Sequence, residues 1–262
     1  MLAPELLAAM ASGCWAVGAL FSANASNSMG AFAFTRWRLF FAMCMLWMAA
    51  FYVGRWPELT LENIAWLSVS SWVGILVGDT ALFVCMNRLG PRRSGVLFAT
   101  HALFSALFAW LFLGETLWGM TLMGSGVLVS GVMVAIVWGR RGEETHAWEN
   151  TQGTLWMGVA MGLLAAVGQA VATLMIKPLM STGIDAVAAS AVRATASFVA
   201  HLLLLWAGLG LAKLANPLDW KTLLNTALSA GISMVIGMTL ILQALKTGQA
   251  NLVAIFSSIA PV

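Results

Sequence analysis

Charged side chains are scarce in this sequence, because only 9% of its 262 residues are Asp, Glu, Lys or Arg. A soluble globular chain averages about 25%. So few charges cannot cover a water-facing surface, and 61% of the residues are hydrophobic. The composition therefore excludes a soluble globular domain. The net charge of +3 does not indicate a nucleic-acid partner, because most of the positive residues lie between apolar runs and report membrane orientation instead.

Cysteine and histidine are also few. Cys14, Cys44 and Cys85 stand singly within apolar runs, which argues against a disulfide framework and against a metal cluster. The three histidines share no ligand spacing, and the sequence lacks a HExxH zinc helix, paired aspartates inside a span and a nucleotide-binding loop. We therefore expect no cofactor, no metal and no ATP-driven step. We expect no enzyme activity, and an intramembrane enzyme remains the least favoured alternative.

Long apolar runs recur along the whole chain. A run of about 20 apolar residues crosses roughly 30 Å of hydrocarbon as a helix. The sequence therefore predicts an all-α integral membrane protein. The first run lacks a basic n-region, so we expect a retained span and not a signal peptide. Breaks at proline, glycine and charge give about nine predicted spans, at residues 6–23, 32–53, 63–87, 93–113, 117–138, 153–176, 184–210, 222–245 and 249–262.

One polar stretch, residues 139–152, cannot stay in hydrocarbon. We predict that it is a solvated linker between two comparable units. The first unit, residues 1–138, contains five predicted spans, and the second unit, residues 153–262, contains about four.

The two units show weak sequence symmetry, as duplicated transporter halves do. Because five spans is an odd number, the second unit enters the membrane from the opposite face. The pattern therefore predicts an inverted repeat of two five-helix units, with ten spans expected and the tenth missing from this chain. The informative matches are Arg38/Arg193, at a shift of 155 (193 − 38), and Arg88/Lys246 and Phe98/Phe256, at a shift of 158 (246 − 88 and 256 − 98).

A short motif links the fourth and fifth predicted spans. A basic and glycine turn leads into a helix that ends in Leu113-Gly114-Glu115, and the next span carries Gly124 and Gly131. This order, over residues 81–137, resembles the end of a repeat of the drug/metabolite transporter (EamA) family. Residues 244–262 resemble the corresponding turn and fourth helix of the second repeat, with Pro261 at a Pro-Val position. The first half departs from that pattern, because Leu103 stands where the proline would be (261 − 158).

The resemblance implies ten helices in two inverted halves, a central cavity and no cofactor. It also implies export or import of small molecules such as amino acids, other metabolites or toxic compounds. We therefore predict a secondary transporter for a small metabolite, amino acid or drug-like solute. Coupling of this transport to an ion or a proton is one form of the prediction. A lipid flippase on the same fold, with a side-open groove, is the alternative. The expected partners are the solute and the lipid bilayer of the cell membrane, with a bacterial inner membrane favoured. The sequence does not decide whether the protein forms a homodimer.

Ionisable side chains inside a span are costly, so each is a candidate for function. Arg38, Asp79 and His101 lie at similar depth, roughly 9 to 14 Å below the same membrane face at 1.5 Å per residue. At that depth they can meet in a substrate or proton site, where Asp79 would be the most consequential residue. The alternative is a static Arg38–Asp79 ion pair with His101 on an unrelated helix face.

The second half repeats the arginine but not the acid, because Arg193 aligns with Arg38 whereas Gly237 occupies the position equivalent to Asp79 (79 + 158). Any charge-based site is therefore asymmetric. Two glutamines complete the candidate set, and for them solute binding competes with hydrogen bonding between helices. These are Gln169 and Gln243.

A polar-lined cavity is expected between the halves, near the midplane. We predict that spans one, three, four, six, eight and nine contribute to it. Trp15 lies in the middle of the first span, but the sequence does not show which helix face it occupies, so it is left out of the predicted site. Small residues at four-residue spacing in spans three, six and eight predict close helix packing.

Overall fold

The structure, a computed structural model, describes residues 2–54, 56, 59–114 and 154–259, with isolated positions between 119 and 134. Within these ranges the secondary structure is helical, and no strand occurs. Helices are expected because hydrocarbon offers no partner to a free backbone N–H or C=O group. The predicted linker 139–152, most of the fifth predicted span, Glu115 and Pro261 lie outside the described residues.

The first half supplies four spanning segments. They are α1 (Pro4–Met29), α2 (Ala31–Val53), a third segment made of α3 (Leu61–Ser71), the π-helix η2 (Trp72–Asp79) and α4 (Thr80–Leu89), and a fourth made of α5 (Pro91–Ala99) and α6 (His101–Leu113). Single glycines separate two of the helix pairs. Gly30 and Gly90 each have a φ of 84°, a backbone region open to glycine, so each permits a one-residue turn.

The second half supplies three long segments and one short helix. They are α8 (Leu155–Ser181), α9 (Ala186–Trp206), a segment made of α10 (Trp220–Ser229), the π-helix η5 (Ala230–Met238) and α11 (Thr239–Thr247), and α12 (Ala250–Ser257), with the 3₁₀ turn η4 (Gly210–Ala212) after α9. Seven segments among the described residues are long and apolar enough to cross a membrane. These seven confirm predicted spans one to four and six to eight.

Polar caps fix the starts of three spanning segments. The side chain of Thr60 accepts a hydrogen bond from Asn63 N at 3.2 Å and begins α3. The Asp185 carboxylate accepts from the backbone N–H groups of the second and third residues of α9 at 3.0 and 2.9 Å. Asp219 accepts from Thr222 N at 3.0 Å and begins α10. Each cap pairs N–H groups that the first turn of a helix leaves free.

The fourth segment is interrupted near its middle, although its proline, Pro91, stands at its first residue and not at the break. Leu103 occupies the position where the family pattern places a proline, yet α5 ends at Ala99 and α6 starts at His101. The hydroxyl of Thr100 donates to Leu97 O at 2.6 Å. Such a bond from a threonine to the preceding turn competes with the helical ladder and bends helices. The hydroxyl bond therefore accompanies a break at which no proline stands.

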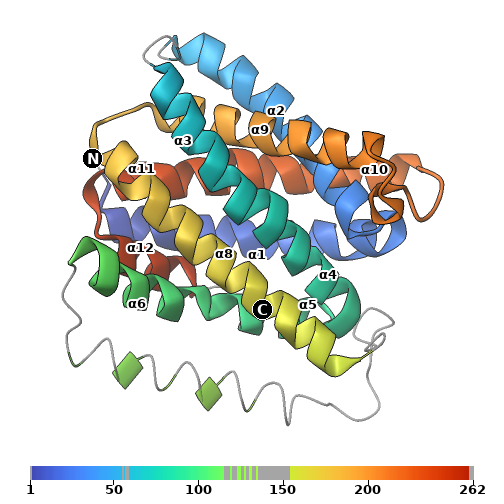
Figure 1. The fold of residues 1–262 in the computed structure, drawn as a ribbon, viewed down its shortest axis with the longest axis horizontal. Helices are drawn as coiled ribbons and strands as arrows, with labels where there is room; N and C mark the ends of the chain where they lie inside the picture. The colour runs from blue at the N-terminus through green and yellow to red at the C-terminus, as the bar shows by residue number, and fades with distance from the viewer. Residues whose placement is uncertain are drawn as a thin grey trace.

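Element boundaries in the two halves keep the sequence shifts. The π-helices η2 and η5 begin 158 residues apart (230 − 72), and α2 and α9 begin 155 apart (186 − 31). The starts of α3 and α10 lie at opposite ends of the bundle (Figure 1). α3 follows the end of α2, whereas the loop before α10 bonds to the end of α1 through Ala215 N and Met29 O, 3.1 Å apart. These features agree with an inverted repeat, which stays a prediction.

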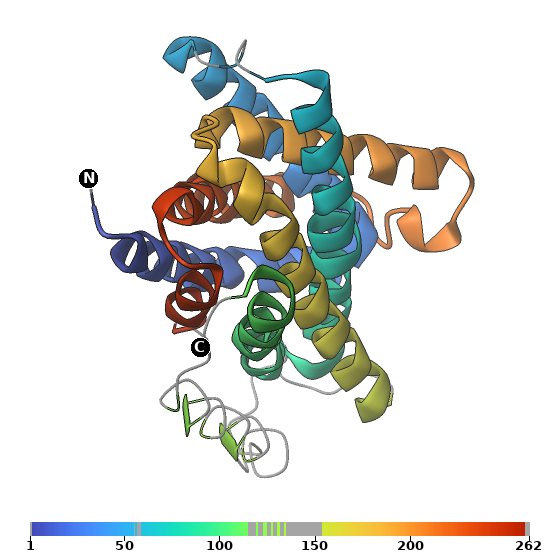
Figure 2. The same cartoon turned by 60° about the vertical axis from the view of Figure 1, so that its left-hand side comes forward.

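Close packing at glycine holds α8 against the first half. α8 packs on η2, α4 and α6, and runs beside the third segment in both views (Figures 1 and 2). A Cβ on Gly158 would lie 2.5 Å from Leu89 Cγ, and one on Gly168 would lie 3.0 Å from the carbonyl oxygen of Val73. The helices are therefore too close for side chains at these positions. This packing is what the small residues of the sixth span predicted.

Candidate functional site

A cavity of about 330 Å³ lies between the two halves. All six predicted spans line it, and so does α2, which was not predicted to contribute. Apolar side chains cover more of the wall than polar ones, so the expectation of a polar lining is correct only in part. The size lies at the lower end of the range of small-molecule pockets. The polar lining residues are Ser12, Ser22, Arg38, Asp79, Arg92, Ser94, His101, Gln169, Ser233, Ser257 and Ser258.

Arg38 and Asp79 form an ion pair in the cavity wall. Arg38 Nη1 donates to Asp79 Oδ2 at 3.2 Å, and the two side chains are only 8% and 14% exposed. The guanidinium carbon also lies 5.0 Å from the centroid of the Phe83 ring, within range of a cation–π interaction. Both partners line the cavity. The structure therefore brings together two of the three charged candidates at the surface a solute would touch.

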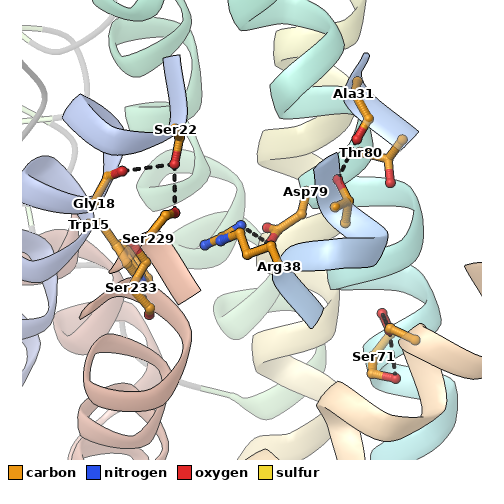
Figure 3. A network of polar contacts seen from close by, with 12 residues as sticks. Trp15, Gly18, Ser22, Ala31, Arg38, Ser71, Asp79, Thr80, Ser229 and Ser233 are labelled. Carbon is orange, nitrogen blue, oxygen red and sulfur yellow. Dashed lines mark hydrogen bonds and ion pairs between the residues drawn. The ribbon is translucent and has the colours of Figure 1, made fainter. Parts of the chain in front are cut away.

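Asp79 is held by an irregular helix. It is the last residue of η2, and π-helical segments are rare and often occur at functional sites. Gly74 and Gly78, within the same segment, allow α8 to approach, since a Cβ on Gly74 would lie 2.6 Å from Ala172 Cβ. Figure 3 shows Asp79 reaching toward Arg38 while the far side of the guanidinium points toward Ser22 and Ser229.

Arg193 lies behind the pair. It is 2% exposed, its Nη1 donates to Met238 Sδ at 3.4 Å, and it is not among the residues that line the cavity. It is nevertheless close enough to interact electrostatically with the Asp79 carboxylate. Two arginines thus act on one carboxylate, which leaves an excess of positive charge beside the cavity.

His101 lines the cavity but bonds elsewhere. Its Nδ1 donates to Phe98 O at 2.9 Å, and its Nε2 lies 3.2 Å from Ser257 Oγ. With Nδ1 as the donor, Nε2 of the neutral imidazole is an acceptor, and it shares the single hydroxyl hydrogen of Ser257 with Ala254 O, which lies 2.9 Å from Ser257 Oγ. The hydrogen bonds that His101 makes within the described residues therefore connect the fourth segment to α12 and do not extend to Asp79.

The two glutamines occupy different environments. Gln169 lines the cavity and is 9% exposed. Its side chain lies near Arg193, because a Cβ on Gly74 would lie 3.8 Å from Gln169 Oε1 and 3.4 Å from Arg193 Nη2. Gln243 is partly buried on α11 and is not among the lining residues. Of the six predicted site residues, four therefore line the cavity, and Arg193 and Gln243 do not.

Trp15 and several serines belong to the cavity but were not predicted as site residues. Trp15 Nε1 donates to Ser233 O at 3.2 Å, and its ring meets Phe98 edge to face at 6.3 Å between centroids. Ser22 Oγ and Ser229 Oγ are 2.7 Å apart and join α1 to α10 (Figure 3). A tryptophan in mid-span, away from the interfacial belts, was the available signal for Trp15. The serines gave no comparable signal.

Comparisons with known proteins cover nearly the whole chain. The model of the EamA-like transporter family matches residues 2–137 and again residues 156–262. A solved structure described as "Crystal structure of protein" is similar, with a TM-score of 0.70 and 19% identity over 98% of this chain and 84% of that chain. At this identity the likeness shows the fold alone. No protein with curated annotation matches the chain.

Proposed function

Because the chain belongs to the EamA-like transporter family, we propose that it is a secondary transporter for a small metabolite, amino acid or drug-like solute. Members of this family are membrane transporters of small solutes and not enzymes. Seven apolar helices among the described residues make this a multi-pass membrane protein. We also propose that it lies in the cell membrane, which in a bacterium is the inner membrane.

The Arg38–Asp79 pair in the cavity wall carries the proposal. Charged side chains inside a span are expensive and are kept where they serve a solute or ion pathway. Both members of this pair line the cavity, where a solute or a proton can reach them. Its position supports a role in solute binding or in coupling to a proton.

The cavity wall comes from both halves, so motion of one half against the other would open it first to one side and then to the other. In this mechanism the solute binds beside Arg38, and Asp79 takes up or releases a proton as the pair opens. A carboxylate inside a span tolerates burial when it is paired or when it is protonated. Solute movement would then draw on the proton gradient.

Transport in proteoliposomes tests the proposal. The purified full chain is reconstituted, and uptake of radiolabelled amino acids and of cationic drugs is followed with and without an imposed pH gradient. We expect at least one solute to accumulate above the level of protein-free liposomes, and to accumulate further with the gradient. Failure of every solute to exceed the protein-free level would overturn the proposal.

One observation favours the flippase alternative. Leu20 lies well inside α1, lines the cavity and is 75% exposed, so the cavity reaches the outer surface of the bundle at this point. A lipid tail has access to such an opening. The same liposomes, made with a fluorescent phospholipid and treated with an impermeant quencher, separate the two functions. Quenching of both leaflets in the protein-containing vesicles alone, without solute uptake, identifies a flippase.

A further inference from the structure

Arg38 has more hydrogen-bond donors than its surroundings use. A guanidinium carries five N–H donors in a planar fork. Among the described residues, one hydrogen bond is formed, from Nη1 to Asp79, and the buried Nε has no partner. The side chain is 8% exposed and lines the cavity. Because a buried donor without a partner is costly, the guanidinium is only partly satisfied by the protein, and its remaining Nη hydrogens point to a ligand that accepts hydrogen bonds.

The charges around the cavity favour an anionic ligand group. Arg38 and the exposed Arg92 line the cavity, and Arg193 lies behind it, whereas Asp79 is the acidic group among the lining residues that the structure describes. His101 faces the same space with Nδ1 already bonded to a carbonyl. An amine approaching Asp79 would have to displace Arg38 and meet Arg193. A carboxylate approaching Arg38 meets an arginine fork, whose geometry it matches with two parallel hydrogen bonds.

The remainder of the wall suits an apolar body. Trp15, Leu82, Phe98 and Met234 line the cavity together with several alanines. Ser22 Oγ donates to Gly18 O at 2.8 Å and accepts from Ser229 Oγ at 2.7 Å, so this serine pair is already satisfied. The serine hydroxyls are thus already engaged with protein acceptors, and the surfaces around Arg38 are mostly apolar.

We propose that the cavity binds solutes that carry a carboxylate on a small apolar body, and that the Arg38 guanidinium holds the carboxylate. The inference rests on the proposed transport function and names the substrate class of the same cavity. Asp79 then competes with the solute for Arg38, so binding of the carboxylate and opening of the ion pair occur together.

Equilibrium dialysis of the detergent-solubilised full chain tests the proposal with three radiolabelled probes that share a phenyl ring. Phenylpropanoate is an anion, phenylalanine a zwitterion and phenylethylamine a cation. We expect phenylpropanoate to bind at least about tenfold more tightly than phenylethylamine, the difference that one charge-assisted hydrogen bond provides. Phenylalanine bound with the affinity of phenylpropanoate supports the same carboxylate site. Phenylethylamine bound equally or better overturns the proposal, as does the absence of phenylpropanoate binding at millimolar concentration.

Variants identify the binding group. The double variant R38Q/D79N keeps a neutral pair of similar shape, and we expect it to lose at least about tenfold in phenylpropanoate affinity. Asp79→Asn alone releases Nη1 and should keep or increase that affinity. Arg88→Gln removes the same charge outside the lining residues and is the matched control. Unchanged phenylpropanoate affinity in R38Q/D79N overturns the proposal.

Size-exclusion chromatography shows whether the double variant folds. If it does not fold, Arg38→Lys is used in place of the double variant. Lysine keeps the charge but loses the planar fork, so affinity should fall while the preference for the anion persists. Wild-type affinity in Arg38→Lys overturns the role of the fork. Binding of phenylpropanoate without its flux in liposomes contradicts the transport function and leaves the carboxylate site standing. Flux of phenylethylamine without phenylpropanoate binding contradicts the carboxylate site and leaves the transport function standing.

Discussion

Asp79 holds Arg38 through a single contact, from Oδ2 to Nη1 at 3.2 Å, inside the wall of a cavity. A bidentate arginine–carboxylate pair would use two parallel bonds and would be harder to open. The single contact leaves the other Nη hydrogens of the guanidinium without a partner among the described residues, and the far side of the group points toward Ser22 and Ser229 (Figure 3). The pair is therefore built to separate when a competing group enters.

Asp79→Asn should uncouple transport from the proton gradient. Asparagine keeps the shape of the side chain but has neither charge nor a titratable proton. One coupled proton supports about tenfold accumulation at a gradient of one pH unit, and we expect the variant to lose this gain while solute exchange without a gradient continues. Uptake in proteoliposomes at several pH gradients measures this loss of accumulation. Glu62→Gln, an exposed acid in the first turn of α3, is the control. Full gradient-dependent transport by Asp79→Asn would refute the coupling role.

Gly18→Ala should destabilise the protein. A Cβ at Gly18 would overlap Ser233 Oγ and would lie 3.1 Å from Ser233 Cβ, so the serine hydroxyl would have to turn away and α1 and η5 would have to shift slightly apart. Overpacking of this kind costs about 1–3 kcal/mol. Gly13→Ala lies in the same helix with nothing within 4 Å of the added atom, and alanine favours a helix by up to about 1 kcal/mol, so its stability should not fall. Thermal unfolding in detergent compares the two variants. Equal melting temperatures would contradict the packing shown here.

The inverted repeat predicts that equivalent caps face opposite sides of the membrane. Cysteines placed at Thr60 and Asp219, in a background without Cys14, Cys44 and Cys85, report this with an impermeant maleimide. In intact cells we expect one of the two positions to react, and both to react after permeabilisation. Reaction of both in intact cells would exclude the arrangement.

The cap of α9 offers a test of local stability. Asp185 accepts hydrogen bonds from Val187 N and Ala188 N, so Asp185→Ala leaves both donors unpaired. The expected loss is about 1 kcal/mol of unfolding free energy. Asp185→Asn retains an acceptor and should stay close to wild type. Thermal unfolding separates the variants. If Asp185→Asn loses as much stability as Asp185→Ala, the effect comes from the charge and not from capping.

Span positions were predictable from the sequence because the length of an apolar run sets whether a helix can cross the bilayer. The proximity of Arg38 and Asp79 also followed from depth, since both residues can be counted from a span end. The depth of a residue in the membrane does not show, however, which face of its helix the side chain occupies. Arg193 and Gln243 were selected by alignment and by polarity, and packing of α9 and α11 directs them away from the cavity.

Contacts between distant segments could not be predicted. His101 bonds to Ser257 across 156 residues, and Trp15 to Ser233 across 218. Both contacts depend on how the two halves meet, which no local pattern encodes. The π-helices were also missed, because a change from α- to π-type hydrogen bonding leaves no trace in the spacing of apolar residues.

The π-helices η2 and η5 have a consequence for insertions and deletions. A π turn contains more residues than an α turn, so one residue can be lost there by reverting to regular helix. In an ordinary α-helix the same loss turns everything downstream by about 100°, since 3.6 residues make a turn. For the third segment, such a rotation would carry Leu82, Phe83 and Met86 away from the cavity. Single-residue gaps among relatives of this chain should therefore gather within residues 72–79 and 230–238 and spare the α-helical flanks.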